Sequence, residues 1–265
     1  MEFSLPEFPA TPIGQAAFVS AALAVVFGLL YLCIPQSMGR LTGLQSARNG
    51  AIGELRPAGG FLAGFAIATL LLDQPVLYAA LGLALGLGAF GRLLSLMSDQ
   101  AVGLVNIVML IVQALMAGAL ATRLPEAFAE AGAFLWPTEF LAQLSAYAYA
   151  GMAGVGLVIM FMPRVSAHIA GLAFLREAGH GPIRSAGGVI LAIGLLGIYV
   201  AGLTESLYVA QLFLAMGMVA ALGLSLVGRV AALAINRGNY LYSLIFLTFS
   251  LLEAAAFASG FAGMI

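Results

Sequence analysis

The chain has 265 residues, of which 63% are hydrophobic and only 8% are charged, and its formal net charge is −1. A soluble domain carries about 25% charged residues, so these proportions exclude a soluble globular fold and indicate a surface solvated by lipid. No basic stripe of the kind that binds nucleic acid is present, and we expect no nucleic-acid partner. The single cysteine, Cys33, excludes an internal disulfide and a thiolate metal cluster.

Eight apolar stretches are candidates to cross the membrane as helices, because a hydrocarbon core of about 30 Å needs around 20 residues. They lack the alternation of β-strands, and a helix satisfies its own backbone groups in lipid. The second stretch is short and the seventh long, so we expect tilt or packing to absorb the mismatch. In chain order, the stretches cover 15–34, 59–73, 76–97, 101–121, 140–163, 186–203, 206–235 and 240–262.

The arginines predict the orientation of these spans. Nine of the ten arginines fall in or beside every second connection, and only Arg123 lies on the other side. Because positively charged loops stay cytoplasmic, we expect both termini on the periplasmic side. Basicity carried by arginine alone, with abundant Ala, Gly and Leu, indicates a bacterial inner membrane. The first span has no basic segment before it, so we do not expect a cleaved signal peptide. The nine are Arg40, Arg48, Arg56, Arg92, Arg164, Arg176, Arg184, Arg229 and Arg237.

The two halves of the chain resemble each other. Nine residues of one gapless window recur 128 positions later, and the pair Gly91-Arg92 recurs 137 positions later as Gly228-Arg229. We therefore expect four-helix repeats at 1–125 and 140–265, joined by an outside linker at 126–139. Four spans per half predict parallel repeats with a pseudo-two-fold axis along the membrane normal. The first nine are Pro35, Gly43, Leu44, Arg48, Gly53, Arg56, Ala58, Gly59 and Gly60.

The cytoplasmic segments 36–55 and 164–181 each follow a proline that ends a span. Their apolar residues approximate one face of a helix, which is typical of short helices in the headgroup layer. Because Gly50 and Gly53 interrupt the first segment, a loop remains the alternative.

At the run Gly53-Glu54-Leu55-Arg56-Pro57-Ala58-Gly59-Gly60, the chain resembles a bacterial membrane family known as domain of unknown function 4345. Its members look like single four-helix units with E-x-R-x-x-G-G before the second span, a G-R pair in the third, and an acidic turn before the fourth. The resemblance covers 15–121 and 144–262 and implies no established activity. The matching residues are Glu54, Arg56, Gly59, Gly60, Gly91, Arg92, Asp99, Arg184, Gly187, Gly188, Gly228 and Arg229.

The chain departs from that family pattern at acidic positions. In the second half, Pro182 replaces the carboxylate before the arginine and Asn236 replaces the turn acid. In the first half, Gln113 stands where the resemblance implies an acid in the fourth span. Glu253 lies near the equivalent depth of the second half. We infer that any site of the family is split or partly lost between these two copies.

Four arginines are candidates for binding an anion or a lipid headgroup: Arg56, Arg92, Arg184 and Arg229. Arg56 and Arg184 open a span at its N-terminus, where a cation opposes the helix dipole, so a negative partner is expected there. Arg92 and Arg229 lie near the C-termini of their spans, where the dipole favours them. Glu54 and Asp99 are the candidate charge partners in the first half. In the second half we expect Glu253, a phospholipid headgroup or a small anion. Alternatively, these arginines only set the topology and extend to the headgroups.

Three polar residues form a candidate intramembrane site. Glu253 would serve as a proton relay or ion ligand, or as a structural partner of Arg229. Gln113 and Asn106 are expected to make hydrogen bonds between helices. His168 and His180 lack a third ligand in the sequence, so we predict no metal site and no cofactor.

The sequence contains no catalytic motif of a hydrolase, kinase or metalloprotease. We therefore expect a non-enzymatic accessory or assembly subunit, or a lipid-binding protein. Its partners would be membrane lipids, another membrane protein or a second copy of the chain. A small permease or channel that uses the cleft between the repeats is the alternative. A lipid-modifying enzyme with Glu253 as general base is a third, less favoured possibility.

Overall fold

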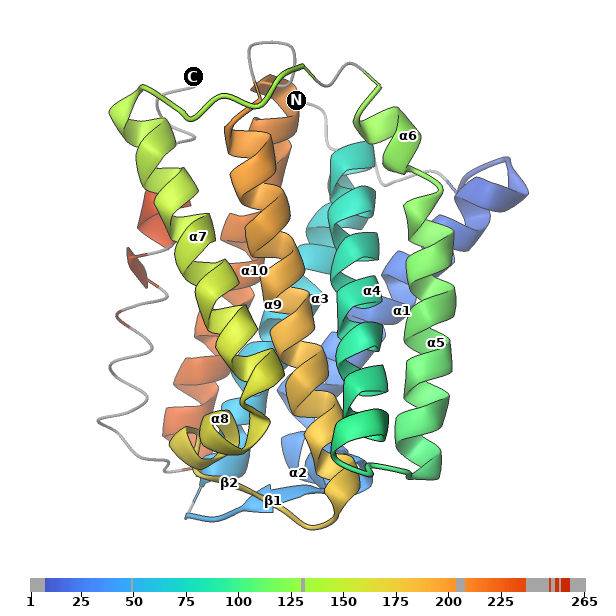
Figure 1. Ribbon diagram of the computed structural model, residues 1–265, viewed down its shortest axis with the longest axis vertical. Helices are drawn as coiled ribbons and strands as arrows, with labels where there is room; N and C mark the ends of the chain where they lie inside the picture. The colour runs from blue at the N-terminus through green and yellow to red at the C-terminus, as the bar shows by residue number, and fades with distance from the viewer. Residues whose placement is uncertain are drawn as a thin grey trace.

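The protein is a bundle of long helices (Figure 1), seen in a computed structural model that describes residues 8–48, 50–129, 132–203, 208–236, 248, 251–252 and 254–257. The long helices are α1 (Pro12–Cys33), α3 (Leu55–Leu72), α4 (Pro75–Ser98), α5 (Leu104–Ala121), α7 (Phe140–Phe161), α9 (His180–Ala201) and α10 (Tyr208–Asn236). The short elements are α2 (Pro35–Thr42), β1 (Leu44–Ser46), η1 (Ala51–Glu54), α6 (Leu124–Ala127), α8 (Pro163–Ile169), β2 (Leu172–Phe174) and η2 (Glu177–Gly179).

Within the described residues, seven helices are long and apolar enough to cross a membrane. This finding confirms a multi-pass, all-α membrane protein. The eighth span expected at 240–262 falls mostly outside the described residues.

The second and sixth spans begin earlier than expected. The second apolar helix runs from Ala51 to Leu72, so the span is not short. Arg56 is accommodated near its start because the Nη1 group donates to the carbonyl oxygens of Leu32 and Cys33, at the end of α1. The sixth apolar helix likewise begins early, at Glu177, and includes Arg184. Hydropathy alone did not predict these first helical turns, because the charged residues Arg56 and Arg184 lower the mean hydropathy at the start of each span.

The segments expected to be interfacial helices are helical only at first. Both α2 and α8 begin at a proline and stop where the chain reaches a glycine with positive φ, Gly43 at 88° and Gly171 at 71°. The chain then forms β1 and β2, which pair antiparallel with Gln45 opposite Ala173. These strands lie together at the bottom of Figure 1. We refer to this end of the bundle as the sheet end.

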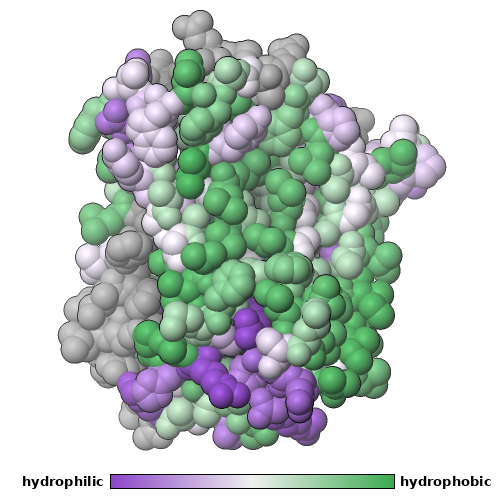
Figure 2. Space-filling model, in the orientation of Figure 1, coloured by the Kyte–Doolittle hydropathy of each residue, from purple (hydrophilic) through white to green (hydrophobic). Residues whose placement is uncertain are grey.

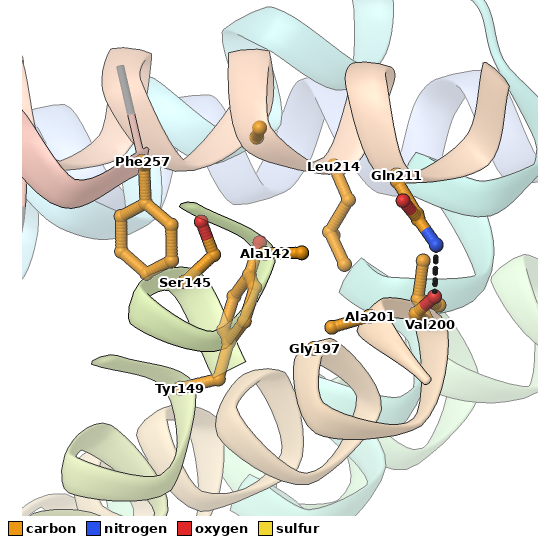
Figure 3. A pocket seen from close by; sticks show the side chains of 10 residues that line it. Ala142, Ser145, Tyr149, Gly197, Val200, Ala201, Gln211, Leu214 and Phe257 are labelled. Atoms are coloured by element: carbon orange, nitrogen blue, oxygen red, sulfur yellow. Dashed lines mark hydrogen bonds between the residues drawn. The ribbon is translucent and has the colours of Figure 1, made fainter. Parts of the chain in front are cut away.

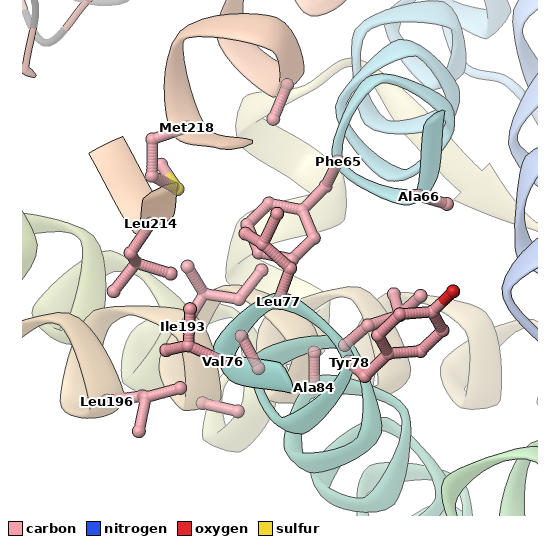
Figure 4. Close-up of a cluster of buried hydrophobic side chains, with 14 of the residues drawn as sticks. Phe65, Ala66, Val76, Leu77, Tyr78, Ala84, Ile193, Leu196, Leu214 and Met218 are labelled. Carbon is pink, nitrogen blue, oxygen red and sulfur yellow. The ribbon is translucent and has the colours of Figure 1, made fainter. Parts of the chain in front are cut away.

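Helices from the two halves of the chain pack against each other at the centre of the bundle. The helix pairs α3–α10 and α4–α9 join the halves, while α1 and α7 pack on the outer sides of α3 and α9. Figure 4 shows side chains of α3, α4, α9 and α10 converging on one core. The largest fully buried members of this core include Phe65, Leu77, Ile193, Leu214 and Met218.

Glycines permit close contact between these helices, because a side chain would collide with the neighbouring backbone. A Cβ atom placed on Gly91 would lie 2.5 Å from the carbonyl oxygen of Arg184. A Cβ atom on Gly228 would lie 2.7 Å from the carbonyl oxygen of Arg56. The two contacts correspond through the internal repeat: Gly228 lies 137 residues after Gly91, and Arg56 lies 128 residues before Arg184.

The surface is consistent with a protein that spans a bilayer. Hydrophobic side chains cover the middle of the face in Figure 2, and hydrophilic ones gather at the sheet end. On α5, Leu104 and Leu115 are 78% and 69% exposed. Such large apolar side chains on a helix surface are stable in hydrocarbon and not in water.

Candidate functional site

Arg184 forms an ion pair with Asp99, which follows α4 in the other half of the chain. The Arg184 Nε and Nη2 groups donate to the two carboxylate oxygens at 2.7 and 3.1 Å. Nη2 also donates to Ser98 Oγ, and Nη1 donates to the Met160 carbonyl oxygen at 2.8 Å. Both charged side chains are 10% exposed. This two-pronged geometry orients the guanidinium rigidly.

The surroundings of Asp99 favour its charged form. Burial raises the pKa of Asp99, but the hydrogen bonds from Arg184 and the positive charges of Arg184, His180 and Arg164 lower it more. The pKa of Asp99 therefore lies below the usual value for an aspartate.

A second ion pair also crosses between the halves. Arg229 on α10 donates through Nη1 to Glu54 Oε2 at 2.9 Å. The expected partner of Arg184 was therefore wrong, because its carboxylate is Asp99 from the first half. The pairing of Glu54 with Arg229 is a contact between the halves that the sequence did not predict. The physical reason is the packing of α4 on α9 and of α3 on α10, which brings each acid to an arginine of the opposite half.

Of the three buried arginines in the described part of the chain, Arg92 is the one whose partners are neutral. It is 6% exposed and lies on α4, six residues before the helix ends at Ser98. Its Nε group donates to Gln113 Oε1 at 2.6 Å, and Nη1 donates to Asn106 Oδ1 at 3.0 Å. The Tyr31 hydroxyl oxygen is a further neutral acceptor beside the guanidinium. Among the described residues, no carboxylate lies within ion-pair distance of Arg92.

An arginine without a counter-charge is costly inside a membrane, by about 2.5–3.5 kcal/mol at the bilayer centre on insertion scales and less near the interface. Neighbouring hydrogen bonds hold its amide partners in place. Asn106 donates to Ser95 Oγ and to the Ala101 carbonyl oxygen, both at 3.1 Å. Gln113 on α5 is hydrogen-bonded to Ser185 on α9 at 3.0 Å. The two amides expected to join helices therefore form one network around Arg92.

A cavity of about 580 Å³ lies beside this network, with walls from both halves of the chain. Residues of α3, α7 and α9 provide most of the lining, and most of the lining side chains are apolar. Arg92, Gln113 and Ser185 all face it and are linked by the hydrogen bonds described above. Its polar lining residues are Tyr31, Glu54, Arg92, Gln113, Ser166 and Ser185.

A much smaller cavity of about 30 Å³ lies between α7, α9 and α10 (Figure 3). Tyr149, Leu214 and Phe257 form part of its wall, and Gln211 donates to the Val200 carbonyl oxygen at 3.0 Å. This volume has room for about one or two water molecules. The larger cavity is therefore the better candidate for a ligand site.

No metal site is found in the described part of the chain, where no three metal-binding side chains come together. His180 stacks on Phe174 with ring centroids 3.9 Å apart, and its Nδ1 atom lies 2.9 Å from the Glu177 carbonyl oxygen. These contacts give His180 a structural role at the sheet end.

The predicted site residues therefore fall into two groups, one that lines the cavity and one that forms ion pairs between the halves. Arg92 and Gln113 line the cavity, whereas Arg184 and Arg229 are held in ion pairs. Glu253 lies outside the described residues. Sequence reasoning missed Tyr31 and Ser185. The signal that could have identified them is a polar side chain within or beside an apolar span.

Comparison of the chain with protein families, curated proteins and solved structures finds no match of any of the three kinds.

Proposed function

We propose that this chain binds one hydrophobic molecule from the bilayer, in the cavity between its two halves. The cavity itself is the observation that carries the proposal. Its volume of about 580 Å³ is within the range of roughly 300–1,000 Å³ typical of small-molecule sites. Apolar walls favour a hydrocarbon ligand, and a few polar side chains in one place would orient it. In this role the chain is a lipid-binding accessory subunit and not an enzyme.

We propose further that the chain consists of two parallel four-helix repeats, with the eighth span at 240–262. The antiparallel strands support this arrangement. Applying the offset of 128 to the pair Leu44–Phe174 gives the pair Leu172–Ser46, which is also observed. A two-fold axis between the strands requires this reciprocity. The glycine contacts of α3 with α10 and of α4 with α9 are related in the same way.

The proposed orientation places the sheet end in the cytoplasm of a bacterium and both termini in the periplasm. Arg40 and Arg164 lie in the short helices of the sheet end, whereas Arg123 precedes α6 at the opposite end (Figure 1). Positive charge concentrated at one end supports this orientation. Cysteine labelling from the periplasm in a Cys33→Ser background would test it. Modification at position 123 and protection at position 48 are expected, and the reverse pattern would refute the orientation.

The proposed ligand binding is tested by filling the cavity. A Cβ atom added at Gly154 of α7 would meet no atom within 4 Å, and Gly154 lines the cavity. Gly154→Phe should therefore occupy ligand space without disrupting the fold. Gly118→Phe is the matched control, because Gly118 is equally open but lies on α5 away from the cavity.

Native mass spectrometry after purification in mild detergent provides the measurement. We expect wild type and Gly118→Phe to retain a hydrophobic molecule and Gly154→Phe to lose it, with similar melting temperatures for all three. A wild-type protein that neither retains nor takes up any hydrophobic molecule would contradict the proposal. Equal retention by Gly154→Phe would also contradict it.

A permease is the second candidate, favoured by the position of the cavity between the halves, where transporters hold their substrates. Flux of the bound molecule across proteoliposome membranes would support it. Ligand binding without any flux would leave the accessory role. The enzymatic alternative depends on Glu253, outside the described residues.

A further inference from the structure

We propose that the ligand is a single-chain amphiphile with an anionic head group, and that Arg92 binds this group together with Gln113 and Ser185. This inference rests on the proposed ligand-binding function and names the class of molecule bound. It is carried by a difference between two buried arginines that occupy corresponding positions of the chain.

Arg229 has a carboxylate partner, whereas the partners of Arg92 are neutral. Arg229 corresponds to Arg92 at the offset of 137, and it is neutralised by Glu54 at 2.9 Å. At the offset of 128, the residue that corresponds to Glu54 is Pro182. Pro182 lines the cavity, as Arg92 does. The cavity therefore lies where the chain lacks the carboxylate that its other half supplies, and a ligand anion would replace that carboxylate.

The surroundings of Arg92 prepare it to bind an anion. Gln113 and Asn106 accept hydrogen bonds from Nε and Nη1 at 2.6 and 3.0 Å, which fixes the plane of the guanidinium. Gln113 is itself held by Ser185. A buried guanidinium of fixed orientation binds carboxylate or phosphate oxygens with favourable geometry. Glu54, which also lines the cavity, and Asp99 are held by other arginines and would not compete strongly with the ligand.

The remaining lining specifies what is attached to the anion. Around the polar group the walls are formed by side chains such as Phe61, Leu62, Val155 and Ile190. A free inorganic anion would leave this apolar volume unfilled. An amphiphile would place its head group at Arg92 and its hydrocarbon chain along these walls, where the chain would fill the apolar volume and make van der Waals contacts with the lining. The volume is that of a site for one small molecule.

The test compares a charged ligand with its neutral analogue. Binding of palmitate, palmitic acid methyl ester and inorganic phosphate would be measured on the full chain in detergent micelles, each against a fluorescent fatty-acid probe. Wild type should bind palmitate at least tenfold more tightly than the ester, and phosphate should not displace the probe. Arg92→Gln should bind both lipids with similar affinity, and Arg92→Lys should restore part of the preference.

A second variant tests the inference without removing the buried arginine. Pro182→Glu would supply the missing carboxylate at the start of α9, where the helix dipole favours an acid. We expect this variant to lose the preference for palmitate and to keep its affinity for the ester. Gly118→Phe should behave as wild type in every assay.

The outcomes separate the inference from the proposed function. Equal binding of palmitate and ester by wild type would overturn the anionic head group and leave the hydrophobic site intact. A palmitate preference that survives in both Arg92→Gln and Pro182→Glu would overturn the assignment to Arg92. Displacement of the probe by phosphate alone would show that a free anion is the ligand. Binding of neither lipid would overturn the proposed function itself.

Discussion

Replacing Asp99 with asparagine tests how the two halves are held together. Asp99 accepts hydrogen bonds from Arg184 at 2.7 and 3.1 Å, and both side chains are 10% exposed. Removing one partner of a fully buried pair costs about 3–5 kcal/mol, whereas an exposed pair contributes at most about 1 kcal/mol. Asparagine keeps one acceptor oxygen but removes the charge. For this pair near the membrane surface, we expect a loss of about 2 kcal/mol.

Thermal unfolding in detergent measures this loss. For a chain of this size, 1 kcal/mol corresponds to about 2–4 °C, so the melting temperature of Asp99→Asn should fall by about 4–8 °C. Ser98→Ala removes only a neutral acceptor from Arg184 and should cause a smaller fall. In a double-mutant cycle, Arg184→Gln should add little once Asp99 is replaced. An unchanged melting temperature, or strictly additive losses, would refute the role of the ion pair.

Three further predictions concern the ion pairs and the glycine contact that join the two halves. The pKa of Asp99 is lowered in the folded protein. The stability that Asp99 contributes should therefore be fully present above its unfolded pKa of about 3.9 and be lost as the pH falls towards the folded value. Between pH 6 and pH 3, the free energy of unfolding should decline more steeply for wild type than for Asp99→Asn. Glu54→Gln should lower the melting temperature to a similar degree, because it leaves Arg229 without this carboxylate partner; an unchanged melting temperature would exclude that contribution. Gly91→Val should destabilise the protein by more than about 2 kcal/mol, since a Cβ would lie 2.5 Å from a backbone oxygen. Gly118→Val should leave the melting temperature unchanged, because Gly118 has open space around it. Equal effects of the two substitutions on the melting temperature would contradict the close packing of α4 on α9.

Hydropathy predicted most of the described helices because it depends on local sequence. The limits of α4 differ by one residue at each end from the stretch expected at 76–97. The strand pair β1–β2 was missed, since three-residue strands carry almost no periodic signal and their pairing joins residues far apart in the chain. Gly43 and Gly171, where the two short helices stop, were present as repeated glycines but were not interpreted as helix ends.

The candidate site was predictable only in part. The sequence singled out Arg92 and Gln113 and showed Pro182 where the first half has Glu54, but it did not single out Tyr31 or Ser185. The sequence could not show that an acid of one half contacts an arginine of the other, because this depends on which helices pack at the centre. The cavity is a property of packing among α3, α7 and α9 and leaves no pattern in the chain.

The reciprocal register of β1 and β2 has a consequence for how such a chain could arise. A strand that pairs with the corresponding strand of a second copy across a two-fold axis is a contact typical of two identical subunits. A half-length polypeptide would thus be expected to form a homodimer with two identical cavities. On the proposed repeat, fusion of two such copies into one polypeptide would allow one carboxylate to be kept and the other to be replaced by proline. Asymmetry of that kind is unavailable to a homodimer encoded by a single short gene.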